Sequence, residues 1–467
     1  MARAGGCDGG DGDDGNSGEA VDGHGDNGDA IDGHGDSGDA IDGHGDSGDA
    51  TDGSGAPRII AFNDVETAFD YPDRLGRLAG AIRARTDDST LLLDAGDSTA
   101  LGALAFTTDC GRGQATAFHD AVAPDVHVPG NHDFDHGPDW LTEFAAATPG
   151  TWLAANAHHD GVFEGSTVRQ VAGEEVAVVG VAHPETATFC AAAEAVRFTD
   201  PVAAVQRAFE AIGPVEHRVV LSHCGQRDRE IARNTDADVV IGGHDHSRTI
   251  ERVDGTLVCR TAGKGRELLG VTVRDTPEAT FVDTATATPD AEVLRAYRGR
   301  LATAGLDDHV TTLSDLGATA TAELVARAYQ TRADADAGLV FEASVREPLE
   351  GAVTTGDIVG TVPFGSDLVT VELAGDQLRE LLGNTREPID DTHGRGIWAG
   401  VDVDRKSIAR GGTAKGEVVD PDDDYRVGMM SYVPESEVLP GIDRSHVVAT
   451  HGPQHEHVLD YLRKNRG

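Results

Sequence analysis

Carboxylate, amide and imidazole side chains gather in five short clusters, and each cluster directly follows an apolar run of the chain. The clusters are Asn63-Asp64-Val65-Glu66, Gly96-Asp97, Gly130-Asn131-His132-Asp133, Ser222-His223 and Gly242-Gly243-His244-Asp245-His246. This mixture of ligand types suits borderline divalent ions such as Mn²⁺, Fe²⁺ or Zn²⁺. Glycine beside a ligand allows a tight turn and a close approach of the backbone. The clusters therefore predict a divalent-metal site.

Such a site has a defined chemistry if one aspartate lies between two cations. Two ions about 3.5–4 Å apart turn a shared water into a hydroxide nucleophile at neutral pH and neutralise the oxygens of a phosphate group. A neutral amide ligand such as Asn131 limits the negative charge of the site. A neighbouring histidine can protonate the leaving oxygen. We therefore expect hydrolysis of a phosphate ester.

Each cluster has a simpler interpretation when it is taken alone. A Gly-Asp pair is a common turn, Asp64 is also a suitable N-cap of a helix, and a single Ser-His or Asn-His pair is usual in cores or on surfaces. The segment 244–246 is more specific, because residues i and i+2 share one side of an extended chain. The order of all five clusters, each after an apolar run, favours one joint site.

Short apolar runs supply the elements that position the clusters. They are RIIAFND, LLLDAGD, VHVPGNHD, VAVVGVAH, RVVLSHCG and DADVVIGGHDH, with helix-like stretches between several of them, such as residues 74–85 and 202–212. Continuous apolar strands that alternate with helices are typical of an α/β layered domain, with each strand buried on both faces. The carboxyl ends of the strands, where the clusters lie, carry the site in such a domain. We place this domain at residues 57–287.

The chain is strongly acidic, with 81 Asp and Glu against 38 Lys and Arg and a formal net charge of −43. Such a field repels nucleic acids and anionic membranes, so we expect no nucleic acid polymer and no membrane as a partner. An acidic, lysine-poor surface fits very high salt, where charges are screened over short distances, and resembles the proteins of extreme halophiles. No apolar run approaches the roughly 20 residues that span a bilayer.

Residues 1–56 form a low-complexity segment with a ten-residue repeat of the type AIDGHGDSGDA. Its few apolar residues do not offset the entropy of ordering, so we expect a disordered acidic tail. A calcium-binding or histidine-mediated metal-binding repeat is the alternative. The five cysteines include no CxxC pair, which argues against a disulfide framework. Because no apolar core of a secretory signal is seen either, we expect a cytoplasmic protein.

The motifs GD, GNHD, SH and GGHDH, in this order, resemble those of the calcineurin-like metallophosphoesterase family. With NDVE at the start, FDHG after GNHD and a second domain, residues 58–467 are similar to the 5′-nucleotidase/UDP-sugar hydrolase group. The resemblance implies a four-layer α/β/β/α sandwich, a smaller C-terminal α/β domain and two divalent metal ions. The implied metal ligands are Asp64 and His246 for the first ion, Asp97 for both ions, and Asn131, His223 and His244 for the second. The implied catalytic pair is His132 with Asp135, which orients it.

One ligand departs from the family pattern. Family members carry His two residues after the first Asp, whereas this chain carries Glu66. Glutamate is a competent oxygen ligand that makes the site harder and more anionic, which favours Mn²⁺ or Mg²⁺ relative to Zn²⁺. In the alternative, Glu66 points to solvent and the first metal is weakly held.

A helix-like stretch at residues 288–311 is expected to link the first domain to a second α/β domain at residues 312–467. In the segment VTTGDIVGTVPFGSDLVTVELAGDQLRELL, the second domain resembles the C-terminal substrate domain of 5′-nucleotidases. The resemblance implies that Phe364 and Tyr432 stack on the two faces of a nucleobase and that Arg346 binds substrate. The motif positions that differ from the family are Glu342-Ala343-Ser344, Ser366 and Pro434-Glu435-Ser436. The alternative is that both aromatics are core residues of a repurposed domain.

The sequence favours a 5′-nucleotidase-like phosphohydrolase that acts on a small-molecule phosphate ester, in particular a nucleotide. A cyclic-nucleotide or other phosphodiesterase would use the same metal centre. A non-catalytic binding protein that kept the fold is the alternative of another class, and the retention of His132 and Asp135 argues against it. The resemblance also implies a hinge rotation between the two domains that delivers substrate to the metals.

Overall fold

The computed structural model describes residues 56–107, 113–159, 163–314, 316–389, 393–408, 417–436 and 438–465. The chain divides into two units, residues 1–54 and 55–467, and all the described helices and strands lie in the second. The predicted tail, apart from Ala56, lies outside the described residues, as do Cys7 and Cys110. The thiols of Cys190, Cys224 and Cys259 are free and buried. Among the residues that the structure describes, no helix is long and apolar enough to span a bilayer.

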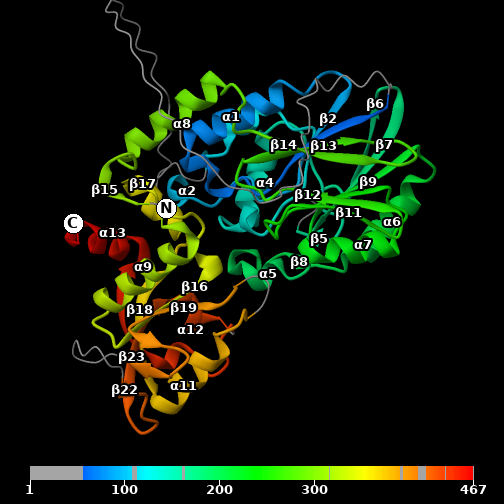
Figure 1. The fold of residues 1–467 in the computed structure, drawn as a ribbon. Helices are drawn as coiled ribbons and strands as arrows, with labels where there is room; N and C mark the ends of the chain where they lie inside the picture. Colours follow the sequence, from blue (N-terminus) through cyan, green and yellow to red (C-terminus); the bar gives the residue numbers. More distant parts are fainter. Residues whose placement is uncertain are drawn as a thin grey trace, which may run out of the picture. The chain divides into compact units, whose positions relative to one another are not determined.

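Two six-stranded sheets form the sandwich, the name used here for residues 58–283 (Figure 1). The first sheet has the order β14-β13-β1-β2-β3-β4, and the second has the order β11-β12-β10-β9-β7-β6. The strands of the first are β1 (Arg58–Phe62), β2 (Thr90–Asp94), β3 (Val126–His127), β4 (Thr151–Trp152), β13 (Glu267–Thr272) and β14 (Glu278–Asp283). Those of the second are β6 (Ser166–Val171), β7 (Glu174–Ala182), β9 (His217–His223), β10 (Val239–Ile241), β11 (Thr249–Val253) and β12 (Thr256–Arg260).

The central strands are parallel, and the antiparallel strands lie at the sheet margins. Strands β1 to β4 run parallel to one another, as do β7, β9, β10 and β12. Strands β13 and β14 close one sheet in antiparallel pairing, and β6 and β11 close the other. The parallel strands of each sheet therefore bring their carboxyl ends to one edge.

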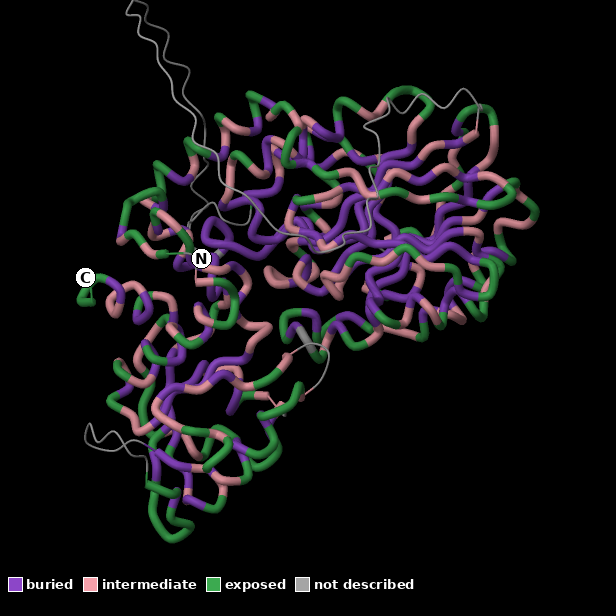
Figure 2. Tube along the Cα trace, viewed as in Figure 1, coloured by how far each residue is buried: buried purple, intermediate pink, exposed green. Residues whose placement is uncertain are grey.

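Successive side chains of a strand point to opposite faces of its sheet, and this alternation explains the four layers. On β1, Ile59 and Ala61 pack between the two sheets against residues of β7, β9 and β10, whereas Ile60 and Phe62 face helices. The helices on that side are α1 (Pro72–Arg83), α3 (Thr116–Val122) and α8 (Ala291–Ala304), and those outside the second sheet are α6 (Pro201–Ile212) and α7 (Asp228–Asn234). Figure 2 shows the buried strands between these outer layers. The predicted α/β/β/α sandwich is confirmed.

Helix boundaries follow local chemistry. At the start of α6, the Asp200 side chain accepts a hydrogen bond from the Ala203 backbone N–H. At the start of α8, the Asp290 side chain accepts hydrogen bonds from backbone N–H groups in the same way. Gly305, with φ of +65°, ends α8 in a left-handed turn that glycine adopts without strain. The helix-like stretch predicted at residues 288–311 contains α8, and its last three residues already belong to β15 (His309–Leu313). Tyr297 of α8 stacks on Phe69 with ring centroids 5.7 Å apart, so α8 packs on the sandwich.

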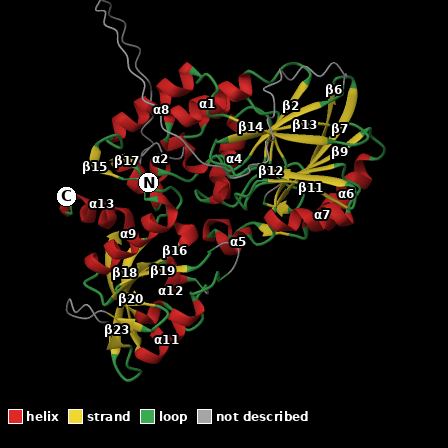
Figure 3. Ribbon diagram, viewed as in Figure 1, coloured by secondary structure: helices red, strands yellow, loops and turns green. Residues whose placement is uncertain are grey.

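The C-terminal part contains a five-stranded sheet of order β19-β16-β23-β18-β24 (Figure 3). Its strands are β16 (Ala337–Phe341), β18 (Asp367–Ala374), β19 (Gly396–Ala399), β23 (Asp424–Met430) and β24 (Val447–Pro453). Helices α9 (Gly317–Arg332) and α13 (Gln454–Lys464) cover one face, and α11 (Gly375–Asn384) covers the other. The second α/β unit is confirmed. Strand β24 and helix α13 were not predicted, and Tyr432 begins the short helix α12 (Tyr432–Glu435) instead of ending a strand.

Smaller elements complete the described chain. The helices are α2 (Ala103–Thr107), α4 (Pro138–Ala147), α5 (Thr186–Phe189) and α10 (Thr355–Thr361). The short strands pair as β5 (Ala157–His158) with β8 (Arg197–Phe198), β15 (His309–Leu313) with β17 (Gly351–Thr354), and β20 (Val401–Asp402) with β21 (Ser407–Ile408) and β22 (Glu417–Val418). Turns of 3-10 helix occur at Glu66–Asp70, His132–Phe134, Ala191–Ala193, Gly225–Arg227, Glu342–Ser344 and Arg444–His446.

Candidate active site

The five predicted clusters lie at the carboxyl ends of the strands β1, β2, β3, β9 and β10: Ser222 and His223 are the last two residues of β9, and the other four clusters follow their strands. Their side chains meet in three groups of carboxylates and imidazoles whose ligand atoms lie within 4.8 Å of one another. The groups are Asp64 with Glu66 and His246, Asp64 with Asp97 and His223, and Glu66 with Asp97 and His132. Asp64, Glu66 and Asp97 each belong to two groups. The structure thus brings together side chains from distant parts of the chain.

Short distances define the centre of this site. His246 Nε2 lies 3.1 Å from Glu66 Oε1 and 3.3 Å from Asp64 Oδ1. His223 Nε2 lies 3.2 Å from Asp97 Oδ2 and 3.9 Å from Asp64 Oδ1. Glu66 is completely buried, so the alternative in which it points to solvent is wrong.

The amide and the first histidine of the GGHDH motif lie together beside these groups. Asn131 Oδ1 is 2.8 Å from His244 Nδ1, and the His244 backbone N–H donates to the Asp64 carboxylate. An amide oxygen, imidazoles and shared carboxylates are the donor types expected around two borderline divalent ions.

The donor set fits a divalent cation because buried polar atoms are left for one. Among the described residues, neither carboxylate oxygen of Glu66 nor Nε2 of His223 has a hydrogen-bond partner of normal geometry, and all three atoms are buried. The other nitrogen of His223, Nδ1, lies 2.6 Å from the Ala95 carbonyl oxygen, which orients Nε2 toward Asp97. A backbone partner that orients a metal-binding imidazole in this way is a usual outer contact of such sites.

Opposite charges set the protonation of the metal-free site. Burial acts to raise the pKa of Asp64, but His246 and His223 outweigh it and lower the pKa to about 2. Burial acts to lower the pKa of His246, but Glu66 and Asp64 raise it to about 9. Asp64 is thus anionic and His246 protonated at neutral pH, and a bound cation would displace the proton of that imidazole.

Strained backbone surrounds the ligand atoms. Asp64, Glu66, Asp97, His244 and His246 have φ of 49°, 42°, 55°, 81° and 47°, in the left-handed region that non-glycine residues rarely adopt. Strain of this kind gathers at functional sites that the surrounding structure holds in place. A Cβ at Gly243 would lie 2.7 Å from both the Ala95 carbonyl oxygen and His223 Nδ1, which explains the second glycine of GGHDH.

His132 lies beside this centre and is oriented by Asp135. His132 Nδ1 is 3.1 Å from Asp135 Oδ2, and the His132 backbone N–H donates to Asp97 Oδ1 at 2.8 Å. Burial acts to lower the pKa of His132, but Asp135 outweighs it and raises the pKa to about 9. The protonated imidazole can therefore act as a proton donor from Nε2. The Cys190 thiol donates to the other oxygen of Asp135 at 3.5 Å.

A cavity of about 610 Å³ joins the predicted residues. Ten of the twelve line it: Glu66, Asp97, Asn131, His132, Asp135, His244, His246, Arg346, Phe364 and Tyr432. The other two, Asp64 and His223, are completely buried. The volume lies within the range of about 300–1,000 Å³ that is usual for small-molecule sites.

Residues of the C-terminal part reach this cavity next to His132. Arg346 Nη2 lies 3.4 Å from His132 Nε2, and its guanidinium lies over the Phe364 ring, 5.4 Å from the centroid. The Tyr432 ring stacks on His393 with centroids 5.8 Å apart, and its hydroxyl lies 3.1 Å from His393 Nε2. One face of Tyr432 is therefore covered by His393.

Family models match both parts of the chain. A model described as calcineurin-like phosphoesterase matches residues 57–248, and one described as 5′-nucleotidase, C-terminal domain, matches residues 301–437. The chain joins a calcineurin-like phosphoesterase domain to a 5′-nucleotidase C-terminal domain. This agrees with the motifs GNHD and GGHDH and with the position of their side chains at the strand ends.

Curated relatives match parts of this chain, and each of those described below is longer than the part that matches. A 5′-nucleotidase of Diplobatis ommata is 33% identical over 179 residues, which cover 36% of this chain and 30% of that protein. The trifunctional nucleotide phosphoesterase protein YfkN of Bacillus subtilis (strain 168) is 25% identical over 395 residues, covering 68% of this chain and 27% of that protein. The chain thus spans about a third or less of the length of these relatives.

A solved structure supports the fold of both domains together. The 5′-nucleotidase precursor from Thermus thermophilus matches with a TM-score of 0.71 and 22% identity, over 88% of this chain and 96% of that chain. At this identity the likeness concerns the fold.

Two residues near the candidate active site were not predicted from the sequence. His183 directly follows β7, whose last residue, Ala182, pairs with His223 in the sheet. The His183 ring stacks on the His244 ring, with centroids 4.9 Å apart. The run VAVVGVAH was a sixth apolar strand ending in a histidine, which could have indicated it. Lys264 lines the cavity and its Nζ donates to the Arg346 carbonyl oxygen.

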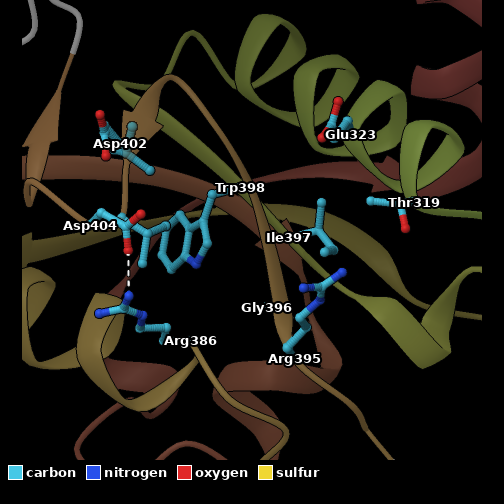
Figure 4. Close-up of a pocket in the computed structure, with 11 residues that line it drawn as sticks. Thr319, Glu323, Arg386, Arg395, Gly396, Ile397, Trp398, Asp402 and Asp404 are labelled. Carbon is cyan, nitrogen blue, oxygen red and sulfur yellow. Dashed lines mark ion pairs between the residues drawn. The ribbon is translucent and has the colours of Figure 1, made fainter.

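A smaller cavity lies within the nucleotidase C-terminal domain (Figure 4). Its volume is about 310 Å³, and it is bordered by Trp398 and by the ion pair of Arg386 with Asp404 at 2.7 Å. Both charged side chains are mostly exposed, so the pair contributes little stability. None of the twelve predicted site residues lines this cavity.

Proposed function

We propose that the chain is a metal-dependent phosphohydrolase that acts on a nucleotide or a similar small phosphate ester. The observation that carries the proposal is the shared cavity, in which the His132–Asp135 pair and the carboxylate–imidazole groups lie beside Phe364 and Tyr432. A site that combines phosphoester chemistry with two aromatic rings suits a substrate with a phosphate and a flat base.

Two divalent ions are proposed as cofactors. The residues that would hold them are Asp64, Glu66, Asp97, Asn131, His223, His244 and His246. Bound ions would supply Lewis-acid neutralisation of phosphate oxygens and lower the pKa of a water. Because Glu66 adds a hard, anionic oxygen donor, we propose Mn²⁺ or Mg²⁺ as better suited than Zn²⁺.

The side chains around the proposed centre have separate tasks. His132 holds a proton that it can give from Nε2 to the leaving oxygen, and Asp135 fixes the ring through Nδ1. Arg346, next to His132, can pair with an anionic oxygen of the substrate. We propose that Phe364 and one face of Tyr432 hold the base, while His393 supports the opposite face of Tyr432.

Hydrolysis of a substrate panel tests the proposal, with orthophosphate measured for the nucleoside monophosphates and with p-nitrophenol, nucleotide or sugar phosphate products measured for the compounds whose cleavage releases no orthophosphate. The full chain at high KCl is given AMP, UMP, UDP-glucose, 2′,3′-cyclic AMP and bis-p-nitrophenyl phosphate with Mn²⁺, Zn²⁺ or EDTA. We expect Mn²⁺-dependent release from nucleoside monophosphates, loss of at least about 100-fold in His132→Ala, and no loss in His309→Ala, which changes an exposed histidine.

The other outcomes discriminate between the alternatives. Cleavage of the diesters alone would replace the nucleotidase assignment by a phosphodiesterase. Metal binding without turnover of any compound would favour a binding protein. Full activity in EDTA, or in His132→Ala, would contradict the proposed chemistry.

A further inference from the structure

Arg260, at the end of β12, is a buried cation close to the candidate metal centre. It is 2% exposed, and its guanidinium makes three polar contacts. Nη1 donates to Asp228 Oδ2 at 3.2 Å, Nη2 lies 3.1 Å from Asp245 Oδ2, and Nε donates to Ser247 Oγ at 3.2 Å. A buried guanidinium paired with two carboxylates is held in one orientation, because its donors form a rigid planar fork.

Two of these contacts lead into the GGHDH segment. Asp245 stands between His244 and His246 in the sequence, and Ser247 follows His246. Arg260 therefore holds the residues on both sides of His246. The Gln226 side chain also donates to Asp245 Oδ2, at 2.9 Å.

The third contact leads to the end of β9. Asp228 is 1% exposed, and its other oxygen, Oδ1, accepts a hydrogen bond from Ser222 Oγ at 2.6 Å. Ser222 directly precedes His223 and its Oγ also accepts the Cys224 amide at 3.2 Å. One guanidinium thus joins the strand ends that carry three of the predicted metal-binding histidines.

Glycines at both strand ends make room for the two carboxylates. A Cβ at Gly242 would overlap the Asp228 carboxylate, and a Cβ at Gly225 would overlap the carboxylate of Asp245. The first glycine of GGHDH therefore admits the Asp228 side chain.

We propose that Arg260 is a positioning residue that holds the imidazoles of His223, His244 and His246 in place for metal binding. His244 and His246 have φ of 81° and 47°, so their segment needs restraint by its surroundings. Arg260 acts through Asp228, Asp245 and Ser247. This inference rests on the proposed metal centre but not on the substrate.

Calorimetric titration of the chelator-stripped full chain with Mn²⁺ tests the inference. We expect Arg260→Gln to weaken Mn²⁺ binding by about 10–100-fold, the usual effect of removing an outer partner of metal ligands. Arg260→Lys, which keeps the charge but lacks the fork, should fall between Arg260→Gln and wild type. The matched control is Arg169→Gln on β6 in the same sheet, where the guanidinium donates to the hydroxyls of Thr151 and Thr167 and to no carboxylate within the described residues, and it should bind Mn²⁺ like wild type.

The unfolding midpoint of each metal-free variant separates positioning from folding. If Arg260→Gln does not fold, Ser247→Ala replaces it, because it removes only the acceptor of Nε, and a few-fold loss is expected. Wild-type Mn²⁺ affinity in folded Arg260→Gln, or equal loss in Arg169→Gln, would overturn the inference. Absence of Mn²⁺ binding by the wild-type chain would refute the metal centre itself and the Arg260 inference with it.

Discussion

Replacing Glu347 by alanine should reduce the free energy of unfolding by about 3–5 kcal/mol, the usual cost of removing one partner of a buried ion pair. Glu347 is 2% exposed, and Oε1 accepts from Thr67 Oγ1 at 2.8 Å and from Arg74 Nη1 at 2.9 Å. Each hydrogen bond to a charged group contributes about 1.5–3 kcal/mol. Arg266, 3.3 Å from Oε2, has a side chain that is 55% exposed, so its contact adds at most about 1 kcal/mol.

Scanning calorimetry of the full chain at high KCl measures the effect. Salt screens the interactions between buried charges weakly, so the loss of stability in Glu347→Ala should persist at high KCl. One kcal/mol moves the unfolding midpoint by about 2–4 °C in a domain of 150–250 residues, so a drop of at least about 6 °C is expected. Glu350→Ala, an exposed change in the same segment, is the control and should stay within about 0.5 kcal/mol of wild type. A drop below about 2 °C for Glu347→Ala would refute the reasoning.

The charged groups around Glu347 also predict how the stability of the chain changes in acid. Burial acts to raise the pKa of Glu347, but Arg74 and Lys264 outweigh it and hold the pKa below its usual value of 4.5. The folded chain thus binds fewer protons than the unfolded chain. This stabilisation is complete above pH 4.5 and is lost as the pH falls through the lower pKa of the folded state. Glu347→Gln, which has no titratable group at this position, should lack this part of the loss of stability in acid.

Gly338→Ala should destabilise the C-terminal sheet by about 1–3 kcal/mol, because a Cβ there would overlap the Ala326 carbonyl oxygen. Gly299→Ala has open space on α8 and should stabilise by about 0.5–1 kcal/mol; equal unfolding midpoints of the two variants would contradict both. Asp70 responds to pH in the opposite sense to Glu347, because burial raises its pKa to about 7. Its stabilisation is complete below pH 3.8 and is lost as the pH rises through about 7. Denaturant titrations at several pH values should show no such decline in the free energy of unfolding of Asp70→Asn. A decline with pH as steep as that of the wild-type chain would contradict this prediction.

The candidate site was largely predictable because parallel strands share a direction. A polar cluster after each apolar run indicates the strand end, and parallel pairing brings such ends to one edge without any knowledge of the loops. The orientation of Glu66 was not predictable, because it depends on a left-handed backbone at that residue. The role of Arg260 was not predictable, because its partner Asp228 stands in no predicted cluster and because Asp245, although it lies within GGHDH, gives no indication of the cation that pairs with it.

The C-terminal part shows where apolar patterning loses its value. Strand β24 pairs with β18 by backbone hydrogen bonds, yet most of its residues are exposed or half-buried, so the sequence VVATHGP lacks a strand pattern. Strand β23 stops at Met430, and Pro434 lies within the short helix α12 that follows, where its missing N–H costs little.

The left-handed backbone at the predicted ligands has a consequence for protein engineering. At each of Asp64, Glu66, Asp97, His244 and His246, a non-glycine residue with this φ costs about 1–2 kcal/mol, which glycine would not incur. Glycine would also remove side chains that stabilise the folded chain, such as the Asp64 and Asp97 carboxylates that accept hydrogen bonds from the His244 and His132 amides. A selection for thermal stability alone weighs these two effects against each other and not against metal binding, so directed evolution of this scaffold has to screen for bound metal in every round.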